Sequence, residues 1–188
     1  MPLQWNALDD VERGVWKAVP LESVGPLRFG MGHEEVERAL EEGMLVSSVV
    51  LDSLDRGVRA EFARRGSNPL SPVLSLSTYY DEGGNLAAVA IDARSGPQVV
   101  MGEFGLVGRV PSEIEGQFVG YVESRGLDLV YSEFWDMSSE ALGIVLRAQR
   151  VDDVVLSRPI FVGRSWGERC GSCSEGRIPQ DEWLRQSR

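Results

Sequence analysis

The sequence contains few of the side chains that usually carry out catalysis or bind metal ions. His33 is the only histidine, and Cys170 and Cys173 are the only cysteines. A single histidine excludes a His-rich metal site, and it makes any Ser-His-Asp or Cys-His mechanism depend on His33. Two glutamates follow this residue at a predicted helix start, which is typical of a solvent-exposed first turn. The sequence therefore contains no recognisable catalytic constellation.

Loops that bind phosphate or calcium are also missing. Glycine is abundant, yet neither GxGxxG nor GxxxxGK[ST] occurs, and no acidic segment has the DxDxDG spacing of a calcium loop. These absences predict a protein without a nucleotide cofactor, and they leave the two cysteines as the main candidate metal ligands.

Positive charge is scarce. The 188 residues include 29 acidic and 19 basic side chains, for a formal net charge of −10, and Lys17 is the only lysine. Proteins that bind nucleic acid use Lys and Arg to neutralise phosphates, and no basic stripe of that kind is present. Nucleic acid and anionic membranes are therefore excluded as expected partners, whereas the negative field favours a basic protein.

Long apolar runs are absent as well. The N-terminal segment MPLQWNALDDVERG has acids where a signal peptide needs a basic start and an apolar stretch. No run approaches the ~20 residues that a membrane-spanning helix requires. We therefore expect a cytoplasmic protein.

What the chain does contain is 43% apolar residues, enough for a sizeable core, arranged with both helical and strand periods. We expect an α+β fold with helices packed on one face of an antiparallel sheet. The expected parts are an N-terminal segment (1–22), a first helix-on-sheet unit (23–102), a second unit (103–160) and a C-terminal tail with the CxxC motif (161–188), which looks like a linker. The expected helices are 6–13, 33–43, 47–65 and 111–126, and the expected strands are 14–19, 73–80, 86–92, 98–101, 129–135, 141–148 and 151–156.

The two units resemble each other. When Gly108 is superimposed on Gly30, Ile114 falls on Val36, Phe118 on Leu40 and Val122 on Met44. These are core positions of two amphipathic helices, so the match predicts a duplicated unit of one helix followed by three strands. Chance is the alternative, because any two amphipathic helices can be aligned.

The segment GMGHEEVERAL (residues 30–40) resembles the entry motif of the SmpA/OmlA family and of the β-lactamase inhibitor protein fold. Repeats of that group begin with Gly-Met, followed by Val and Ala-Leu at helical spacing. Gly30, Met31, Val36, Ala39 and Leu40 match this pattern. The resemblance implies a small layered α+β module that binds other proteins through its sheet and loops, without catalysis.

Cys170 and Cys173 form a Cys-Gly-Ser-Cys motif, which suits a dithiol/disulfide couple or half of a four-thiolate zinc site. A structural zinc ion would need further ligands, from His33 and acids or from a second subunit. Redox enzymes place such a motif at a helix N-terminus, whereas this one lies in the tail. An incidental thiol pair or a disulfide that pins the tail is the simpler interpretation.

Polar and aromatic side chains alternate along two predicted strands. Ser75, Ser77 and Tyr79 share one face of the first strand, and Tyr131, Glu133 and Trp135 share one face of the second. Asp81 and Glu82 occupy the adjoining hairpin turn. Aromatic rings interleaved with acids make a candidate protein-binding surface, since Tyr and Trp give a large contact area at small entropic cost. Alternatively, Tyr131 and Trp135 cover the inner face of the sheet.

These observations predict a non-enzymatic protein-binding module of bacterial type, an immunity or inhibitor protein acting on a basic partner. The candidate partner-binding residues are Ser77, Tyr79, Asp81, Glu82, Tyr131, Glu133 and Trp135. One alternative is a redox or metal-dependent protein that acts through Cys170 and Cys173. Another is a protein that binds a small molecule in a groove between helix and sheet.

Overall fold

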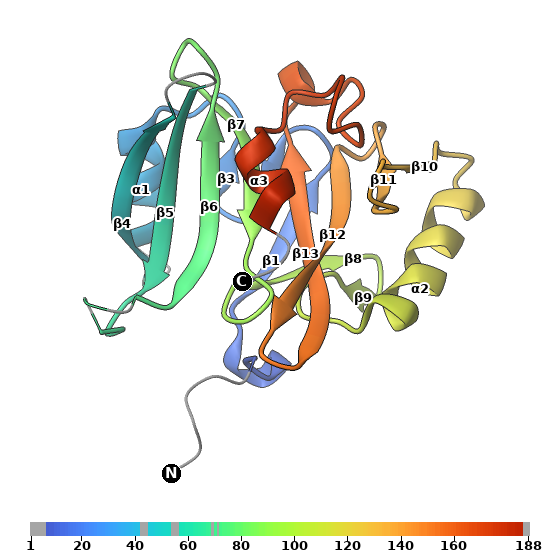
Figure 1. Cartoon of the computed structure of the whole chain (residues 1–188), viewed down its shortest axis with the longest axis horizontal. Coiled ribbons are helices and arrows are strands. Elements are labelled where there is room, and N and C mark those ends of the chain that lie inside the picture. Colours follow the sequence, from blue (N-terminus) through green and yellow to red (C-terminus); the bar gives the residue numbers. More distant parts are fainter. Residues whose placement is uncertain (1–6, 42–44, 54–56, 69, 71, 186–188) are drawn as a thin grey trace.

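The computed structural model describes residues 7–41, 45–53, 57–68, 70 and 72–185. Figure 1 shows their arrangement. In chain order the elements are η1 (Asp10–Glu12), β1 (Val15–Val19), β2 (Ser23–Val24), β3 (Leu27–Arg28), α1 (His33–Glu41), β4 (Leu45–Ser53), β5 (Gly57–Arg64), β6 (Leu74–Tyr80), β7 (Leu86–Ile91), β8 (Gln98–Met101), β9 (Phe104–Gly105), α2 (Pro111–Ser124), β10 (Val130–Tyr131), β11 (Met137–Ser139), β12 (Ile144–Val151), β13 (Val154–Val162), η2 (Arg164–Trp166) and α3 (Gln180–Leu184).

The strands form two sheets. The large sheet has eight strands in the order β10-β11-β12-β13-β7-β6-β5-β4, and every neighbouring pair in it is antiparallel. The small sheet has the order β3-β2-β1-β8-β9, and its β1 and β8 run parallel, with Trp16 opposite Val99. The expected α+β class with mostly antiparallel strands is confirmed.

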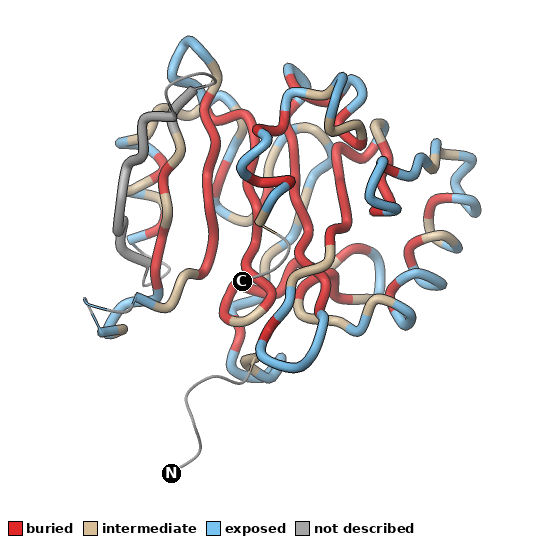
Figure 2. Tube along the Cα trace, in the orientation of Figure 1, coloured by how far each residue is buried: buried red, intermediate tan, exposed pale blue. Residues whose placement is uncertain are grey.

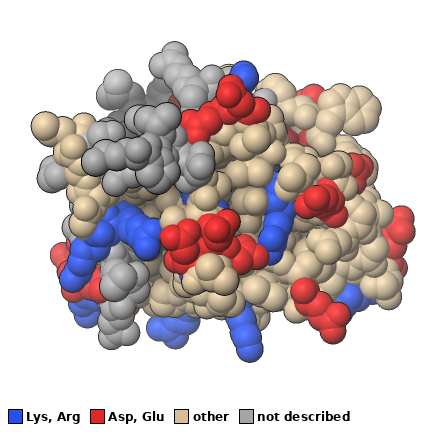
Figure 3. Space-filling view, turned by 90° about the horizontal axis from the view of Figure 1, so that it is seen from below, with Lys and Arg blue, Asp and Glu red and all other residues tan. Residues whose placement is uncertain are grey.

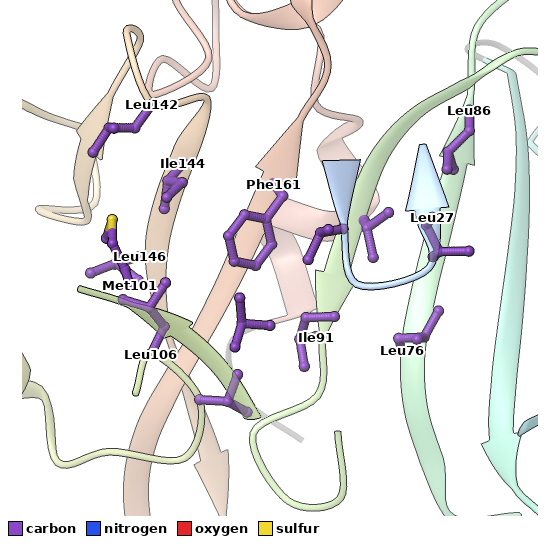
Figure 4. Close-up of a cluster of buried hydrophobic side chains, with 14 of the residues drawn as sticks. Leu27, Leu76, Leu86, Ile91, Met101, Leu106, Leu142, Ile144, Leu146 and Phe161 are labelled. Atoms are coloured by element: carbon purple, nitrogen blue, oxygen red, sulfur yellow. The ribbon is translucent and has the colours of Figure 1, made fainter. Parts of the chain in front are cut away.

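The main core lies between the inner face of the large sheet and a layer made of the small sheet, α1 and α2. Helix α1 buries Val36 and Leu40, and α2 buries Ile114, Phe118 and Val122, so the apolar residues of each helix are spaced by four and share one face. Figure 4 shows the centre of this core, where side chains of β12 and β13 point toward Met101 and Leu106. Both helices therefore pack on one face of the large sheet.

The helix expected at residues 47–65 is wrong, because the described residues of this segment belong to two antiparallel strands, β4 and β5. β4 pairs with β5 along its length, with Val50 opposite Ala60, and β5 in turn pairs with β6. Valine, which is frequent in this segment, packs well in strands and loses side-chain freedom in helices. The apolar residues also fit a helical period, but their strand propensity and the pairing of β5 with both neighbours favour the strands.

Three further expectations at the level of elements need correction. The helix expected at 6–13 is one 3-10 turn, Asp10–Glu12, within the described residues. The strand expected to extend the 73–92 hairpin, β8, instead joins the small sheet beside β1. The strand expected at 129–135 is confined to the two residues of β10, and the residues after it form the turn that leads to β11.

If the predicted duplication occurred, the strand order makes its unit one helix followed by four strands, not the expected three. Each long helix is followed by four antiparallel strands, β4–β7 after α1 and β10–β13 after α2, and the two sets meet at the β7–β13 pair. Gly30 and Gly108, which the sequence alignment superimposes, both have positive φ angles, +96° and +68°. Only glycine adopts such angles readily. A duplication would produce this order, and it stays a prediction.

The surface carries charges of both signs. On the face seen from below, acidic groups lie near the middle with basic groups on either side, and no continuous basic stripe crosses it (Figure 3). Among the described residues, no helix combines the length and the apolar character needed to cross a membrane.

Candidate functional site

The C-terminal tail covers the outer face of the large sheet. Trp166, Cys170, Ile178 and Trp183 of the tail are buried against Tyr79 and against small or aliphatic residues of β7, β12 and β13. Helix α3 crosses the front of the central strands in Figure 1, and these strands are buried along most of their length in Figure 2. The expectation of a linker-like tail is therefore wrong, because its apolar residues complete a second core.

The polar face expected on β6 lies under this tail. Tyr79 is 2% exposed and Ser77 is fully buried, so neither can contact a partner in this conformation. Ser75 is buried as well. Burial and the nearby Glu182 carboxylate raise the pKa of Tyr79 well above its usual value. The sequence pattern located the face correctly but could not show that residues about a hundred positions later cover it.

Glu182, in α3, is the centre of a buried ionic cluster. Its Oε1 accepts a hydrogen bond of 2.7 Å from Arg158 Nε, and its Oε2 accepts one of 3.2 Å from Arg158 Nη2. The Tyr79 hydroxyl donates a hydrogen bond to Oε2, and Asp92 Oδ2 lies 3.6 Å from Arg158 Nη1. Burial alone would lower the pKa of Arg158, but Glu182 and Asp92 outweigh this effect and raise it. Both charges of the pair are therefore retained inside the protein.

Arg147 connects α3 to the turn between β10 and β11. Its Nη1 and Nη2 donate to the carbonyl oxygens of Glu182 and Trp183, at 2.5 and 2.9 Å, where α3 ends. Carbonyls in the last turn of a helix have no partner within the helix, so Arg147 satisfies two of them. Its Nε donates to Asp136 Oδ2 at 3.2 Å. Arg147 is 3% exposed, so its hydrogen bonds are shielded from solvent.

We call residues 130–135 the aromatic loop. Its turn is closed by a hydrogen bond of 3.0 Å from Trp135 N to Ser132 O and one of 2.8 Å from Ser132 N to Asp136 O. The Ser132 hydroxyl oxygen accepts hydrogen bonds from the amides of Phe134 and Asp136, each at 3.0 Å. These contacts fix the backbone of the loop.

Trp135 occupies a backbone position that glycine usually takes. Its φ is +65°, in the left-handed region, and it follows a tight turn in a hairpin. For a bulky residue this conformation costs about 1–3 kcal/mol, and such residues cluster at functional sites. Its side chain is nevertheless 82% exposed, so packing in the folded chain does not explain the choice of tryptophan.

The aromatic loop presents an apolar surface to solvent. Val130, Tyr131 and Phe134 are each 44% exposed beside Trp135, and the ring centroids of Tyr131 and Trp135 lie 6.5 Å apart. The alternative that Tyr131 and Trp135 cover the inside of the sheet is therefore wrong. Phe134 stacks on Trp183 of the tail, with ring centroids 6.2 Å apart and ring planes at 28°, so the loop packs against the tail.

Glu133 joins the aromatic loop to the segment that contains the cysteine motif. Its carboxylate accepts hydrogen bonds of 2.9 Å from the amide of Cys173 and from the hydroxyls of Ser172 and Ser174. The Cys173 amide and the other hydrogen bonds lower the pKa of Glu133 to about 2. Two regions that the sequence analysis treated separately thus form one site.

Both thiols are in environments that disfavour the thiolate. Burial, assisted by Glu140, raises the pKa of Cys170 to about 12, and burial together with Glu133 raises the pKa of Cys173. Redox enzymes and metal sites use the thiolate, whose pKa is lowered at reactive cysteines. Among the described residues, no group of three or more His, Cys, Asp or Glu side chains could hold a metal ion. The described residues therefore give these two cysteines no further zinc ligands.

We expect both cysteines to react slowly with iodoacetamide at neutral pH. A pKa of about 12 reduces the thiolate fraction of Cys170 by about a thousandfold relative to a free cysteine. Cys173 is half-buried and should be labelled first. Mass spectrometry of the alkylated peptides measures both rates, and unfolding in urea should make them equal. A thiol that reacted faster in the folded protein than in urea would contradict this prediction and favour the redox alternative.

The remaining candidate residues lie apart from the aromatic loop. Asp81 shapes the turn between β6 and β7, since its Oδ1 accepts hydrogen bonds of 2.9 Å from the amides of Gly83 and Asn85. Glu82 is exposed in the same turn. This turn closes the end of β6 and β7 in Figure 1, across the large sheet from β10 and β11. Asp81 therefore has a structural role in the hairpin.

A cavity of about 240 Å³ lies where the small sheet, α2 and the large sheet meet. Its walls are largely apolar and include Leu21, Phe29, Met101, Tyr121 and Phe161. This is one groove between helix and sheet of the kind that the small-molecule alternative requires, and it is smaller than the ~300–1,000 Å³ typical of ligand pockets.

No protein-family model, no curated protein and no solved structure matches this chain. The function therefore has to be inferred from the site itself. Arg147, Arg158 and Glu182 were missed in the sequence, and the available signal was the presence of two arginines in otherwise apolar strands, which usually indicates a buried carboxylate partner.

Proposed function

We propose that this chain is a non-enzymatic protein-binding module whose aromatic loop contacts the partner. The observation that carries the proposal is Trp135, which is held at a backbone position suited to glycine and is 82% exposed. Tryptophan and tyrosine are enriched among the few residues that supply most of the energy of protein interfaces. A strained, exposed tryptophan is best explained by a contact outside the chain.

The loop is also prepared for binding in advance. Hydrogen bonds to Ser132 fix its backbone, Glu133 is tied to the tail, and Phe134 stacks on Trp183. A surface that is already ordered loses little conformational entropy when a partner binds. This supports a binding role for the loop in preference to a flexible connection between β10 and β11.

The net charge of −10 supports a basic partner, because the field of an acidic protein attracts positively charged molecules and repels acidic ones. An immunity or inhibitor protein that blocks a basic enzyme or toxin fits this combination of charge and exposed aromatic rings. The SmpA/OmlA-like resemblance of residues 30–40 also stays a prediction, and it agrees with a binding role.

Affinity capture from the lysate of the source cells tests the proposal with two replacements of Trp135. Trp135→Ala and Trp135→Gly should each reduce recovery of the partner by about tenfold or more, as expected for a central interface tryptophan. Trp135→Gly should at the same time raise the free energy of unfolding by about 1 kcal/mol, because glycine removes the backbone strain. Quantitative mass spectrometry and urea unfolding measure the two effects.

The matched control is Leu70→Ala, which removes another side chain that is 95% exposed. This variant should recover the same proteins as the unmodified chain. Because Trp135→Gly is expected to be more stable, its loss of binding cannot result from unfolding. Equal recovery by the unmodified chain and both Trp135 variants would overturn the proposed function.

A further inference from the structure

The inner side of the aromatic loop, which faces the tail, contains two aromatic rings, a carboxylate and an arginine. The guanidinium of Arg147 lies 4.7 Å from the centre of the Trp183 ring and 6.0 Å from that of Phe134. The same guanidinium donates a hydrogen bond to the Asp136 carboxylate. The inner side thus combines a pair of aromatic rings, a carboxylate and an arginine that contacts both.

The outer side of the loop has the rings and the carboxylate without the arginine. The rings of Tyr131 and Trp135 are inclined at 57° to each other, with centroids 6.5 Å apart, and Glu133 lies in the same turn, two residues from each. In the part of the chain that the structure describes, Glu133 forms no ion pair and no basic side chain lies over Tyr131 or Trp135.

The Glu133 carboxylate remains available to a cation. Its three hydrogen bonds come from neutral donors, an amide and two hydroxyls, so they fix its position without neutralising its charge. The lowered pKa of Glu133, about 2, keeps the carboxylate negatively charged at neutral pH. Glu133 is an exposed, fixed negative charge in the same turn as two exposed rings, and charge and ring faces both attract a positive side chain.

We propose that the partner inserts an arginine side chain at the outer side of the aromatic loop, where it lies over the rings of Tyr131 and Trp135 and pairs with Glu133. This inference rests on the protein-binding function proposed above. Arginine fits better than lysine, because its planar guanidinium stacks on rings, is weakly hydrated and binds a carboxylate through two donors. On the inner side, Arg147 makes contacts of the same kinds with Trp183, Phe134 and Asp136.

Titration of the whole protein with N-acetyl-L-arginine amide, followed by NMR at fixed ionic strength, tests this inference without a known partner. The indole N–H signal of Trp135 is assigned by its loss in Trp135→Ala. The arginine amide should shift this signal by about threefold more than the matching lysine and glutamine amides at equal concentration. Glu133→Gln should reduce the arginine effect by about threefold, because the charged partner of the guanidinium is lost.

A double replacement, Ser172→Ala with Ser174→Ala, is the matched control for Glu133→Gln. It removes two hydrogen bonds to Glu133 and keeps its charge, so the arginine effect should persist. Equal shifts with the arginine and glutamine amides, or an arginine effect unchanged by Glu133→Gln, would overturn the inference. If capture of a protein partner still depended on Trp135 in that case, the proposed function would stand and only the choice of arginine would be wrong.

Discussion

Replacing Glu182 with alanine is expected to lower the free energy of unfolding by about 3–5 kcal/mol, the usual cost of removing one member of a buried ion pair. Glu182 is fully buried, and among the described residues the Arg158 guanidinium would then keep Asp92, at 3.6 Å, as its one charged partner. The hydroxyl of Tyr79 would lose its acceptor as well. Urea unfolding followed by circular dichroism measures the change.

Two further variants separate charge from shape at this position. Glu182→Gln keeps the size of the side chain and should lose less stability than Glu182→Ala. The triple replacement Glu182→Met, Arg158→Met, Tyr79→Phe should recover part of the loss, because apolar groups of similar volume replace a buried pair at little net cost, although Asp92 loses its charged partner. A loss of less than about 1 kcal/mol in Glu182→Ala would contradict the prediction and would indicate that the tail leaves the sheet easily.

Replacing Arg147 with methionine is expected to cost about 3 kcal/mol and to loosen the aromatic loop. The change leaves the Asp136 carboxylate and the carbonyl oxygens of Glu182 and Trp183 without their donor. Burial already raises the pKa of Asp136 even with Arg147 present, so this carboxylate depends strongly on its partner. Methionine keeps much of the volume and the contact with the Trp183 ring.

Hydrogen exchange distinguishes this effect from a general loss of stability. The amides of Phe134 and Asp136, which donate to the Ser132 hydroxyl, should exchange faster in Arg147→Met, even in conditions where the amides of β6 and β7 remain protected. Arg147→Lys is the control, since lysine restores the charge but cannot reach three acceptors with one planar group. Unchanged exchange at Phe134 and Asp136 would show that the loop is held without Arg147.

The elements with a clear local period were predictable from the sequence. The spacing of Val36 and Leu40 and that of Ile114, Phe118 and Val122 indicated α1 and α2, and both helices pack as expected. Alternation from residue 73, followed by the turn at Asp81 and Glu82, indicated the β6–β7 hairpin. In these segments, local propensity and tertiary packing favour the same structure.

The candidate site was predictable only in part. Tyr131, Glu133 and Trp135 were identified as partner-binding residues, but the pattern that placed them on a strand missed the turn that exposes Trp135. Tyr79 was placed on an exposed face because alternation shows which residues share a face, not what covers that face. The cover comes from Glu182 and Trp183, whose partners lie too far away in the sequence for any local pattern to indicate them.

The parallel pairing of β1 with β8 also has a kinetic consequence. Arg13, just before β1, donates a hydrogen bond of 2.6 Å to the carbonyl of Gly96, and Gln98 lies opposite Val15. Arg13 and Gly96 are 83 positions apart, and bringing such distant residues together costs chain entropy. Proteins dominated by contacts between residues distant in the sequence fold in about milliseconds to seconds, not microseconds. We therefore expect the β-hairpins to form before the small sheet and before the tail docks on the large sheet.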